Sequence, residues 1–288
     1  MTARSGRMKI PVVVGTDTSS PRRRLAAALL AAGVFALASA AASATRAQTP
    51  PSQSQAAPAG PNVLEPRSVA ALKRMGQHLV SLKSFEISAT ISTEYVLDNN
   101  QKILIGGTSR YRVRRPDRLR IDLATDVLER VFQYDGKNLV VTAPKEKFFA
   151  HLDARPTVRE TLAWAAQTFG IEVPLADLFD WGTADSSEKD MREGFAVGKS
   201  LVQGVECEHW AFRQADADWE IWIRTGDAPL PLKLSITNTA DPALPRYEAV
   251  LSWTETGDFA DEIFTQSPAP DAKRIDFLPL ASGPGQRR

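Results

Sequence analysis

Short segments in which apolar and polar residues alternate follow one another along most of this 288-residue chain. In the first of them, Phe85, Ile87 and Ala89 alternate with polar residues, which is the pattern of a strand with one buried face. Turn signals such as Pro116-Asp117 and Asp135-Gly136 separate the segments, and links this short allow only antiparallel neighbours. The expected strands are residues 85–95, 103–113, 119–123, 129–134, 139–142, 148–152, 195–199, 205–212, 219–224, 232–237 and 247–254. The pattern therefore predicts an antiparallel sheet of about eleven strands.

Helical patterns precede and interrupt these strands. From Val69 to Leu82, after Pro66, apolar residues recur at spacings of three and four, which predicts a helix with one buried stripe. In the middle of the chain, Thr157 opens a capping box and a helical pattern runs to Phe169, followed by a short helix over residues 174–179. A twisted sheet of so many strands tends to curl. The expected fold class is mainly β with helices (α+β): a curled antiparallel sheet forming a half-open barrel, closed by the N-terminal helix and the mid-chain helical insert.

The N-terminal region has the features of an export signal. Arg22-Arg23-Arg24 precedes an apolar run over residues 25–38, and Ala42-Ser43-Ala44 has the small-x-small form of a cleavage site. The alternative is a membrane anchor, but the run is shorter than the ~20 residues of a spanning helix. We expect a signal peptide over residues 1–44, a disordered linker over 45–66, one domain over 67–280 and a flexible tail over 281–288. The mature protein should be soluble and periplasmic.

Charge and cysteine content exclude several classes of protein. Removing residues 1–44 changes the formal net charge from +1 to about −4, whereas a nucleic-acid binder is expected to be basic. The single cysteine, Cys207, lies far from the cleavage region, so it cannot carry the lipid of a bacterial lipoprotein. With no second cysteine there is no internal disulfide, and a buried, inert thiol is expected.

No stretch of the sequence carries a complete catalytic or metal-binding motif. Between Gly194 and Gly198 there are three residues, where a phosphate-binding loop needs four. Cys207 and His209 share a strand face but supply only half of a zinc site. We therefore predict no catalytic residue, no metal and no cofactor.

Aromatic residues are concentrated in the C-terminal strands. Most of them are expected to be core, but on the concave face of a curled sheet such side chains can also line a cavity for an apolar ligand. The candidate cavity residues are Ile87, Ile91, Tyr111, Leu162, Phe169, Trp219, Trp222 and Trp253.

Four residues are candidates for contact with an anionic head group or a partner. Arg110, Arg112 and Arg114 alternate with apolar residues, so they share one strand face, which is either a solvated surface or a basic strip. Trp164 falls on the polar back of the mid-chain helix. Either the chain around Phe179 and Trp181 folds over Trp164, or it is an exposed anchor for a membrane or a partner.

The order of these elements resembles a family of predicted periplasmic proteins, a domain of unknown function whose fold is similar to the lipoprotein carriers (LolA, LolB, LppX-like proteins and RseB). The resemblance spans about residues 67–279. It is carried by residues 72–85, Pro156-Thr157-Val158-Arg159-Glu160-Thr161-Leu162-Ala163-Trp164, Pro174-Leu175-Ala176-Asp177-Leu178-Phe179, Val205-Glu206-Cys207-Glu208-His209-Trp210, Trp219-Glu220-Ile221-Trp222-Ile223 and Pro231-Leu232-Lys233. It implies a half-open barrel that holds acyl chains, but no functional residue of the carriers maps onto this chain.

Three functions remain open at this point. The first is an exported binding or carrier protein for a lipid, a lipoprotein acyl chain or another apolar ligand, with at most transient membrane contact. The second is an envelope sensor or assembly factor that binds a protein partner through the same fold. A hydrolase is the least favoured, because no acid, base and nucleophile occur together in the pattern.

Overall fold

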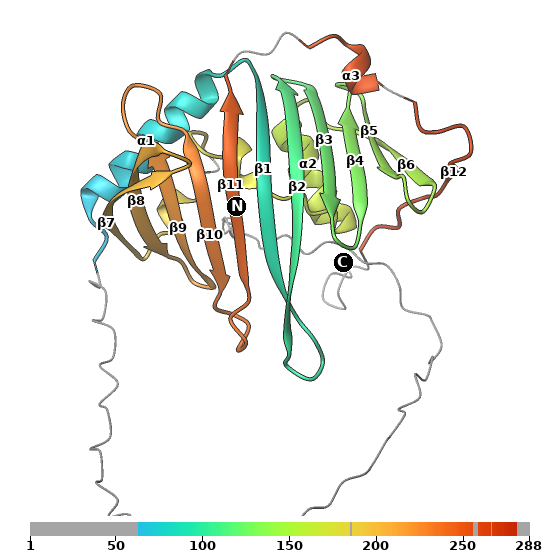
Figure 1. Ribbon diagram of the computed structural model, residues 1–288. Helices are drawn as coiled ribbons and strands as arrows, with labels where there is room; N and C mark the ends of the chain where they lie inside the picture. Colours follow the sequence, from blue (N-terminus) through green and yellow to red (C-terminus); the bar gives the residue numbers. More distant parts are fainter. Residues whose placement is uncertain (1–62, 185, 256–258, 266, 281–288) are drawn as a thin grey trace, which may run out of the picture. The chain divides into compact units, whose positions relative to one another are not determined.

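The computed structural model describes residues 63–184, 186–255, 259–265 and 267–280 (Figure 1). The helices are α1 (Pro66–Ser81), α2 (Val158–Phe169) and α3 (Glu262–Thr265), with short 3-10 helices η1 (Ala176–Phe179) and η2 (Ser187–Asp190). The strands are β1 (Ser84–Val96), β2 (Lys102–Arg114), β3 (Arg118–Thr125), β4 (Glu129–Tyr134), β5 (Asn138–Ala143), β6 (Phe148–Asp153), β7 (Glu193–Val202), β8 (Val205–Arg213), β9 (Ala217–Arg224), β10 (Pro231–Asn238), β11 (Arg246–Thr254) and β12 (Lys273–Arg274).

All twelve strands belong to one sheet, in the order β12-β6-β5-β4-β3-β2-β1-β11-β10-β9-β8-β7. The ends of this order are different strands that do not pair, so the sheet is open. Every pair is antiparallel except that of β12 with β6, which is parallel. The predicted mainly β fold with an open antiparallel sheet is confirmed, and each of the eleven expected strands is present.

The alternation along the strands decides which side of the sheet becomes the core. On β1, Phe85, Ile87, Ala89 and Ile91 are all buried, as their spacing of two predicts. In the view of Figure 1, α2 lies behind the strands β2 to β4. We call the side of the sheet that α1 and α2 cover the inner face, and the opposite side the outer face.

Both long helices begin and end where the sequence predicts. Pro66 occupies the first turn of α1, and the stripe Leu72, Met75 and Leu79 is buried. The Thr157 side chain accepts a hydrogen bond from the Glu160 N–H at the start of α2. At the other end of α2, Gly170 has a φ of 69°, in the left-handed region that glycine adopts without strain.

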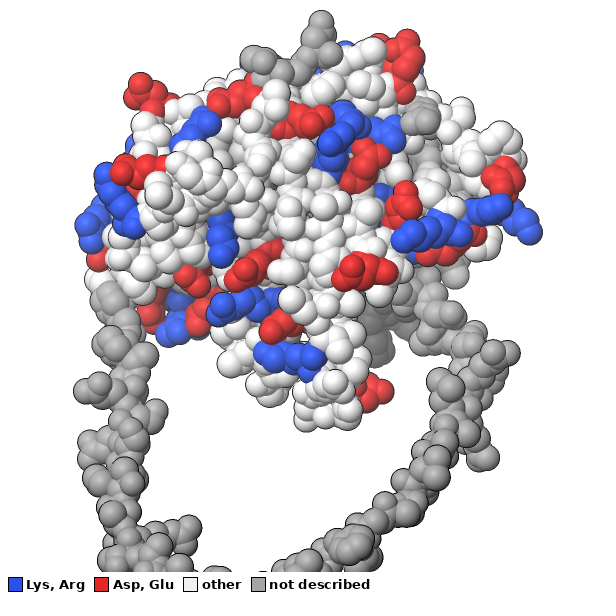
Figure 2. All heavy atoms as spheres, in the orientation of Figure 1, with Lys and Arg blue, Asp and Glu red and all other residues white. Residues whose placement is uncertain are grey.

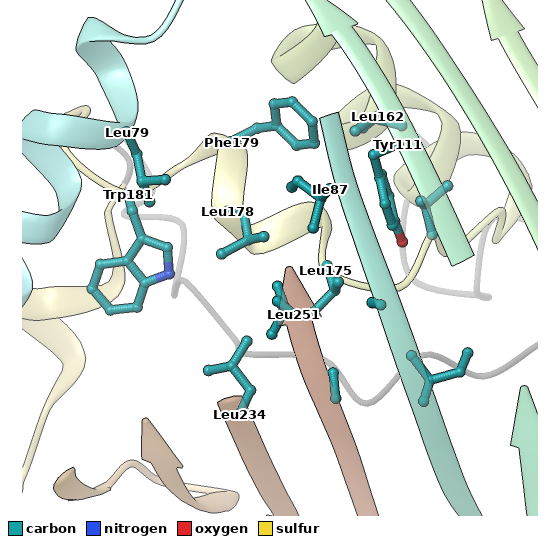
Figure 3. Close-up of a cluster of buried hydrophobic side chains, with 14 of the residues drawn as sticks. Leu79, Ile87, Tyr111, Leu162, Leu175, Leu178, Phe179, Trp181, Leu234 and Leu251 are labelled. Atoms are coloured by element: carbon teal, nitrogen blue, oxygen red, sulfur yellow. The ribbon is translucent and has the colours of Figure 1, made fainter. Parts of the chain in front are cut away.

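The core is a layer of apolar side chains between the inner face and the helices (Figure 3). Phe179 of η1 lies near Ile87 and Leu162 of α2 near Tyr111, while Leu79 of α1 lies next to Trp181. Because α1 and α2 both contact η1, the helices and the segment between α2 and β7 form one continuous cover on the inner face.

Some boundaries differ from the expected ones. Leu64 pairs with Gly194 of β7, and Glu65 donates a backbone hydrogen bond to the Gly194 carbonyl, so the fold begins before Arg67. The expected signal peptide, most of the linker and the expected tail over 281–288 lie outside the described residues. None of the helices that the structure describes is long and apolar enough to cross a membrane.

Candidate binding site

The segment over residues 155–184, which contains α2 and η1, forms a lid over the inner face, and most of the candidate cavity residues lie beneath it. Ile87, Ile91, Tyr111, Leu162 and Trp219 belong to one core cluster, each with 6% or less of its surface exposed. Phe169 and Trp253 are half-buried and pack against this cluster. In the described state, apolar side chains of the protein itself occupy the space between the sheet and the lid.

Trp222 lies on the opposite face of the sheet from the candidate cavity residue Trp219. It lies three residues after Trp219 on β9, and residues three apart on a strand point to opposite faces. Trp222 stacks on His209 with ring centroids 4.0 Å apart, and the Lys233 ammonium lies 4.8 Å from its ring centroid. The expectation that Trp222 and Trp219 line the same cavity is therefore corrected.

Two tyrosine hydroxyls tie the lid to the sheet. Tyr111 of β2 donates a 2.6 Å hydrogen bond to the Pro174 carbonyl, and Tyr134 of β4 donates a 2.5 Å hydrogen bond to the Arg155 carbonyl, just before α2. Burial raises the pKa of Tyr111, so its phenol stays protonated and remains a donor. The Thr161 hydroxyl also donates to the Arg155 carbonyl. The Val158 N–H donates to the Pro116 carbonyl, and apolar side chains of the lid pack into the core cluster on the inner face.

The far end of the lid meets α1 at a contact between two glycines. Gly182 has a φ of 78°, and a Cβ on it would collide with the Gly76 carbonyl. A Cβ on Gly76 would lie 2.5 Å from the Gly182 nitrogen. Backbone therefore packs directly on backbone here, which only glycine permits.

Trp164 is covered, but not by the residues that the sequence suggested. It is half-buried, and its ring meets Phe169 edge to face with centroids 5.1 Å apart, while the Arg155 guanidinium lies 4.8 Å from its centroid. Phe277, from the C-terminal segment, packs in turn on Phe169. The expectation that chain near Phe179 and Trp181 covers Trp164 is corrected, because those side chains lie in the core beneath the lid.

We predict that Trp164→Ala lowers the free energy of unfolding by roughly 1 to 3 kcal/mol, less than for a fully buried tryptophan. The loss combines the contact with Phe169 and the cation–π contact with Arg155. Denaturant unfolding of both proteins measures it. A change near zero would contradict the prediction, because it would mean that Trp164 is effectively free in solution.

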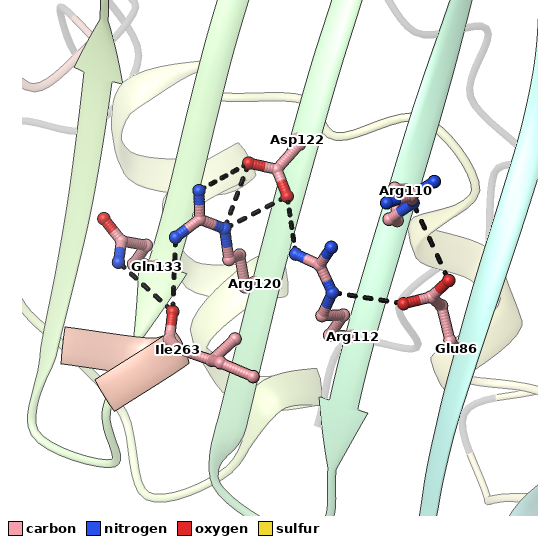
Figure 4. A network of polar contacts seen from close by, with 7 residues as sticks. All are labelled: Glu86, Arg110, Arg112, Arg120, Asp122, Gln133 and Ile263. Atoms are coloured by element: carbon pink, nitrogen blue, oxygen red, sulfur yellow. Dashed lines mark hydrogen bonds and ion pairs between the residues drawn. The ribbon is translucent and has the colours of Figure 1, made fainter. Parts of the chain in front are cut away.

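The arginine strip lies on the outer face, opposite the apolar layer. Arg112 bridges Glu86 and Asp122 with contacts of 3.1 Å each, and Arg120 forms a bidentate pair with Asp122 (Figure 4). One sheet thus separates these arginines from the lid.

Arg114 shares the face of Arg110 and Arg112 but lies in a different environment. It bonds to the Phe259 carbonyl and to Asp261, and its guanidinium lies 5.5 Å from the ring centroid of Phe264. Phe264 of α3 is 1% exposed. Arg114 therefore anchors the segment around α3 to the outer face, a structural role that strand alternation alone did not suggest.

An open hollow of about 560 Å³ lies on the outer face beside these residues. Small side chains, including Ser88, Thr90 and Thr108, form its floor over β1 and β2, and Gln203 reaches it from the β7–β8 turn. Gln203 is held there by a 3.1 Å hydrogen bond that its side-chain oxygen accepts from Ser252. The rim carries Arg110, Arg112, Arg120, Arg130, Asp122 and Glu129. Figure 2 shows cationic and anionic side chains interspersed over this face.

Cys207 and His209 have separate structural roles. Cys207 is fully buried, and burial raises the pKa of its thiol, which favours the unreactive protonated form. His209 lies 2.8 Å from a Glu220 carboxylate oxygen and stacks on Trp222. Each of the two side chains thus has its own surroundings, as expected for packing residues.

The family model described as "Predicted periplasmic protein (DUF2092)" matches residues 68–278. The chain belongs to this family. The periplasmic location that the leader predicted is confirmed by the description of the DUF2092 family. A comparison with curated proteins gave no match.

Among solved structures, this DUF2092 protein is similar to lipoprotein LppX of Mycobacterium tuberculosis, with 12% identity, a TM-score of 0.44 and coverage of 67% of this chain and 98% of LppX. An uncharacterized conserved protein from Thermus thermophilus has 12% identity, a TM-score of 0.41 and coverage of 72% and 97%. MucB has 15% identity, a TM-score of 0.39 and coverage of 73% and 65%. At such TM-scores the similarity says nothing about ligand or partner.

Proposed function

We propose that this protein binds a lipid, a lipoprotein acyl chain or another apolar ligand in the periplasm, between the inner face of the sheet and the lid. One observation carries the proposal: an open sheet presents an apolar face to a separate lid, which packs on it through apolar side chains and is tied to it by the hydroxyls of Tyr111 and Tyr134. Such an arrangement can exchange protein side chains for ligand when the lid moves.

Binding of this kind needs no catalytic group. Each Å² of apolar ligand surface removed from water contributes about 25 cal/mol, and the ligand replaces contacts that Leu162 makes with the sheet in the closed state. Opening breaks the hydrogen bond from Tyr111 to the Pro174 carbonyl, which would have to form again with water or ligand. The cost of opening therefore keeps the apolar layer covered until a ligand is available.

Native mass spectrometry of protein purified from membranes, together with titration of a fluorescent fatty acid, tests the proposal. We expect bound lipid in the wild type. We expect Leu162→Ser to weaken fatty-acid binding about tenfold or more, because it makes the underside of α2 polar. Gln167→Ser, at an exposed position of the same helix, should bind as the wild type does. If neither lipid nor fatty acid binds the wild type, the proposal is wrong.

The hollow on the outer face favours a second candidate function, the binding of a protein partner. Arg110 is its best available cation: its side chain is 54% exposed, and its contact with Glu86 is 3.6 Å long. Arg112 and Arg120 are already held by closer carboxylates. An acidic partner would therefore contact Arg110 first.

We predict that Arg110→Glu leaves the melting temperature within about 2 °C of the wild type, since an exposed ion pair contributes little to stability. If a partner binds here, the variant should lose it in a cross-linking pull-down from periplasm, and the loss should depend on salt. Arg74→Glu, the same charge change on α1 at a side chain 56% exposed, is the matched control. Equal capture by all three proteins would exclude the hollow as the partner site.

A further inference from the structure

The β1–β2 hairpin projects beyond its two neighbouring strands, β11 and β3. The pairing of β1 with β11 ends at Thr93, and the pairing of β2 with β3 ends at Gly107. Beyond these residues β1 and β2 pair only with each other, and their last pair is Val96 with Lys102. Figure 1 shows the hairpin reaching past the other turns at the same end of the sheet. We call residues 94–105 the hairpin tip.

The hairpin tip combines exposed aliphatic side chains with a polar turn. Leu97 and Ile103 lie on one face and are 40% and 37% exposed, and Leu104 lies on the other and is 65% exposed. Glu94 and Lys102 form an ion pair at 2.9 Å, and the turn residues 98–101 are polar and exposed. Aliphatic side chains beside a polar turn suit the interfacial layer of a bilayer, where head groups and acyl chains meet.

The inner face links the core to this tip without an intervening charged residue on β1. Ile87, Ala89 and Ile91 are buried, the next inward positions Thr93 and Tyr95 are half-buried, and Leu97 is exposed. Burial raises the pKa of Tyr95, so its phenol remains uncharged as well. The apolar surface beneath the lid therefore continues along one strand to the exposed end of the hairpin.

We infer that the hairpin tip inserts into the surface of a lipid bilayer and brings the inner face of the sheet to the lipid. The role of the tip as the route by which ligand enters rests on the proposed function, whereas its insertion can be measured independently. The contact is shallow and reversible, because only a few aliphatic side chains enter the bilayer.

The small area of the tip is what selects a bilayer over a protein. A stable, specific protein interface buries about 800 Å² on each partner. Three side chains of the tip, each between 37% and 65% exposed, supply only a minor part of that area. A bilayer needs no complementary shape, and each side chain that enters it contributes separately. A second copy of the chain or another protein would need a larger surface than the tip offers.

Vesicle flotation of the full mature protein tests the inference. The probes are vesicles of phosphatidylcholine alone and vesicles that also contain phosphatidylglycerol. We expect the wild type to float with both and to gain little from the anionic lipid, because the tip carries few charges. The triple variant Leu97→Ser, Ile103→Ser, Leu104→Ser should bind about tenfold or more weakly.

A matched control uses the β7–β8 hairpin, where Val197, Leu201 and Val205 are 51%, 71% and 40% exposed. Changing these three residues to Ser should leave flotation unchanged, because the β7–β8 turn lies against the outer face, where Gln203 accepts a hydrogen bond from Ser252, and does not project beyond the sheet. If the triple tip variant has a lower melting temperature than the wild type, Leu104→Ser alone is used, since Leu104 is the most exposed of the three.

The inference is wrong if the wild type does not float, or if the wild type and the tip variant float equally. It is also wrong if the β7–β8 control loses as much flotation as the tip variant. A fourth contrary result is flotation that requires phosphatidylglycerol and is lost in Arg110→Glu. Fatty-acid binding in solution is measured on the same variants and separates the two proposals. A tip variant that binds fatty acid but not vesicles supports both. If the tip is needed for flotation while the wild type binds no fatty acid, the hairpin inference stands and the proposed function fails.

Discussion

Trp219→Ala is expected to lower the free energy of unfolding by about 3 to 5 kcal/mol, which corresponds to a drop of roughly 6 to 20 °C in melting temperature. Trp219 is 1% exposed and stacks on Phe212 with ring centroids 4.5 Å apart, and Trp181 of the lid lies 5.8 Å away. The substitution therefore leaves a cavity where the lid, the inner face and the C-terminal strands meet. Thermal unfolding followed by circular dichroism measures the effect.

Trp222→Ala is the control for this prediction. Trp222 lies on the same strand but on the outer face, where it contacts His209 and Lys233. We expect a loss of only about 1 to 2 kcal/mol, because a half-buried side chain gives up less apolar contact. If the two variants were equally destabilised, the assignment of the inner face as the single apolar core would be wrong.

The second large effect is expected from Gly182→Ala. Alanine at a φ of 78° costs about 1 to 2 kcal/mol, and the collision of its Cβ with the Gly76 backbone adds about 1 to 3 kcal/mol of overpacking. The variant should also free the end of the lid, so proteolysis between α2 and β7 should become faster. Urea unfolding and limited proteolysis measure the two consequences.

Gly204→Ala separates the two causes. Gly204 has a similar φ of 81°, but nothing lies within 4 Å of the position that a Cβ would take. Only the backbone cost of about 1 to 2 kcal/mol should remain, with no change in proteolysis of the lid. A loss as large as that of Gly182→Ala would remove the evidence for a tight contact between α1 and the lid.

The long elements could be predicted because local pattern and tertiary environment agree. Alternation with one buried face specifies β1, and the capping residues Thr157 and Gly170 specify the ends of α2. By contrast, β12 has two residues and pairs with β6 through backbone contacts that leave no local pattern. For α3 the contacts of Arg114 with the Phe259 carbonyl, and of Arg120 and Gln133 with the Ile263 carbonyl, join residues far apart in the sequence.

Alternation along a strand predicts which side chains of the candidate site share a face of the sheet, and the sequence predicted no more of the site than that. Parity correctly puts Arg110 and Arg112 on one face, and it also separates Trp219 from Trp222, a signal that composition alone obscured. The side of the sheet that the helices cover depends on long-range packing. The cover on Trp164 involves Phe277 through Phe169, and a helical period cannot specify a contact with residues so far along the chain. The sequence also contained an indication of the hairpin tip, because the aliphatic residues Leu97, Ile103 and Leu104 flank a predicted turn.

Under the proposed function, the open sheet affects which sizes of ligand the protein could accommodate. The diameter of a closed barrel is fixed by its strand number and stagger, so widening it breaks hydrogen bonds between strands. Here the end strands β7 and β12 do not pair with each other, and the chain before α1 borders β7 through the bridge from Leu64 to Gly194. Small changes in twist between neighbouring strands can therefore alter the curvature while every ladder stays intact. Capacity is then a property of the lid and of the side chains beneath it, and proteins with the same number of strands can differ in the volume they hold.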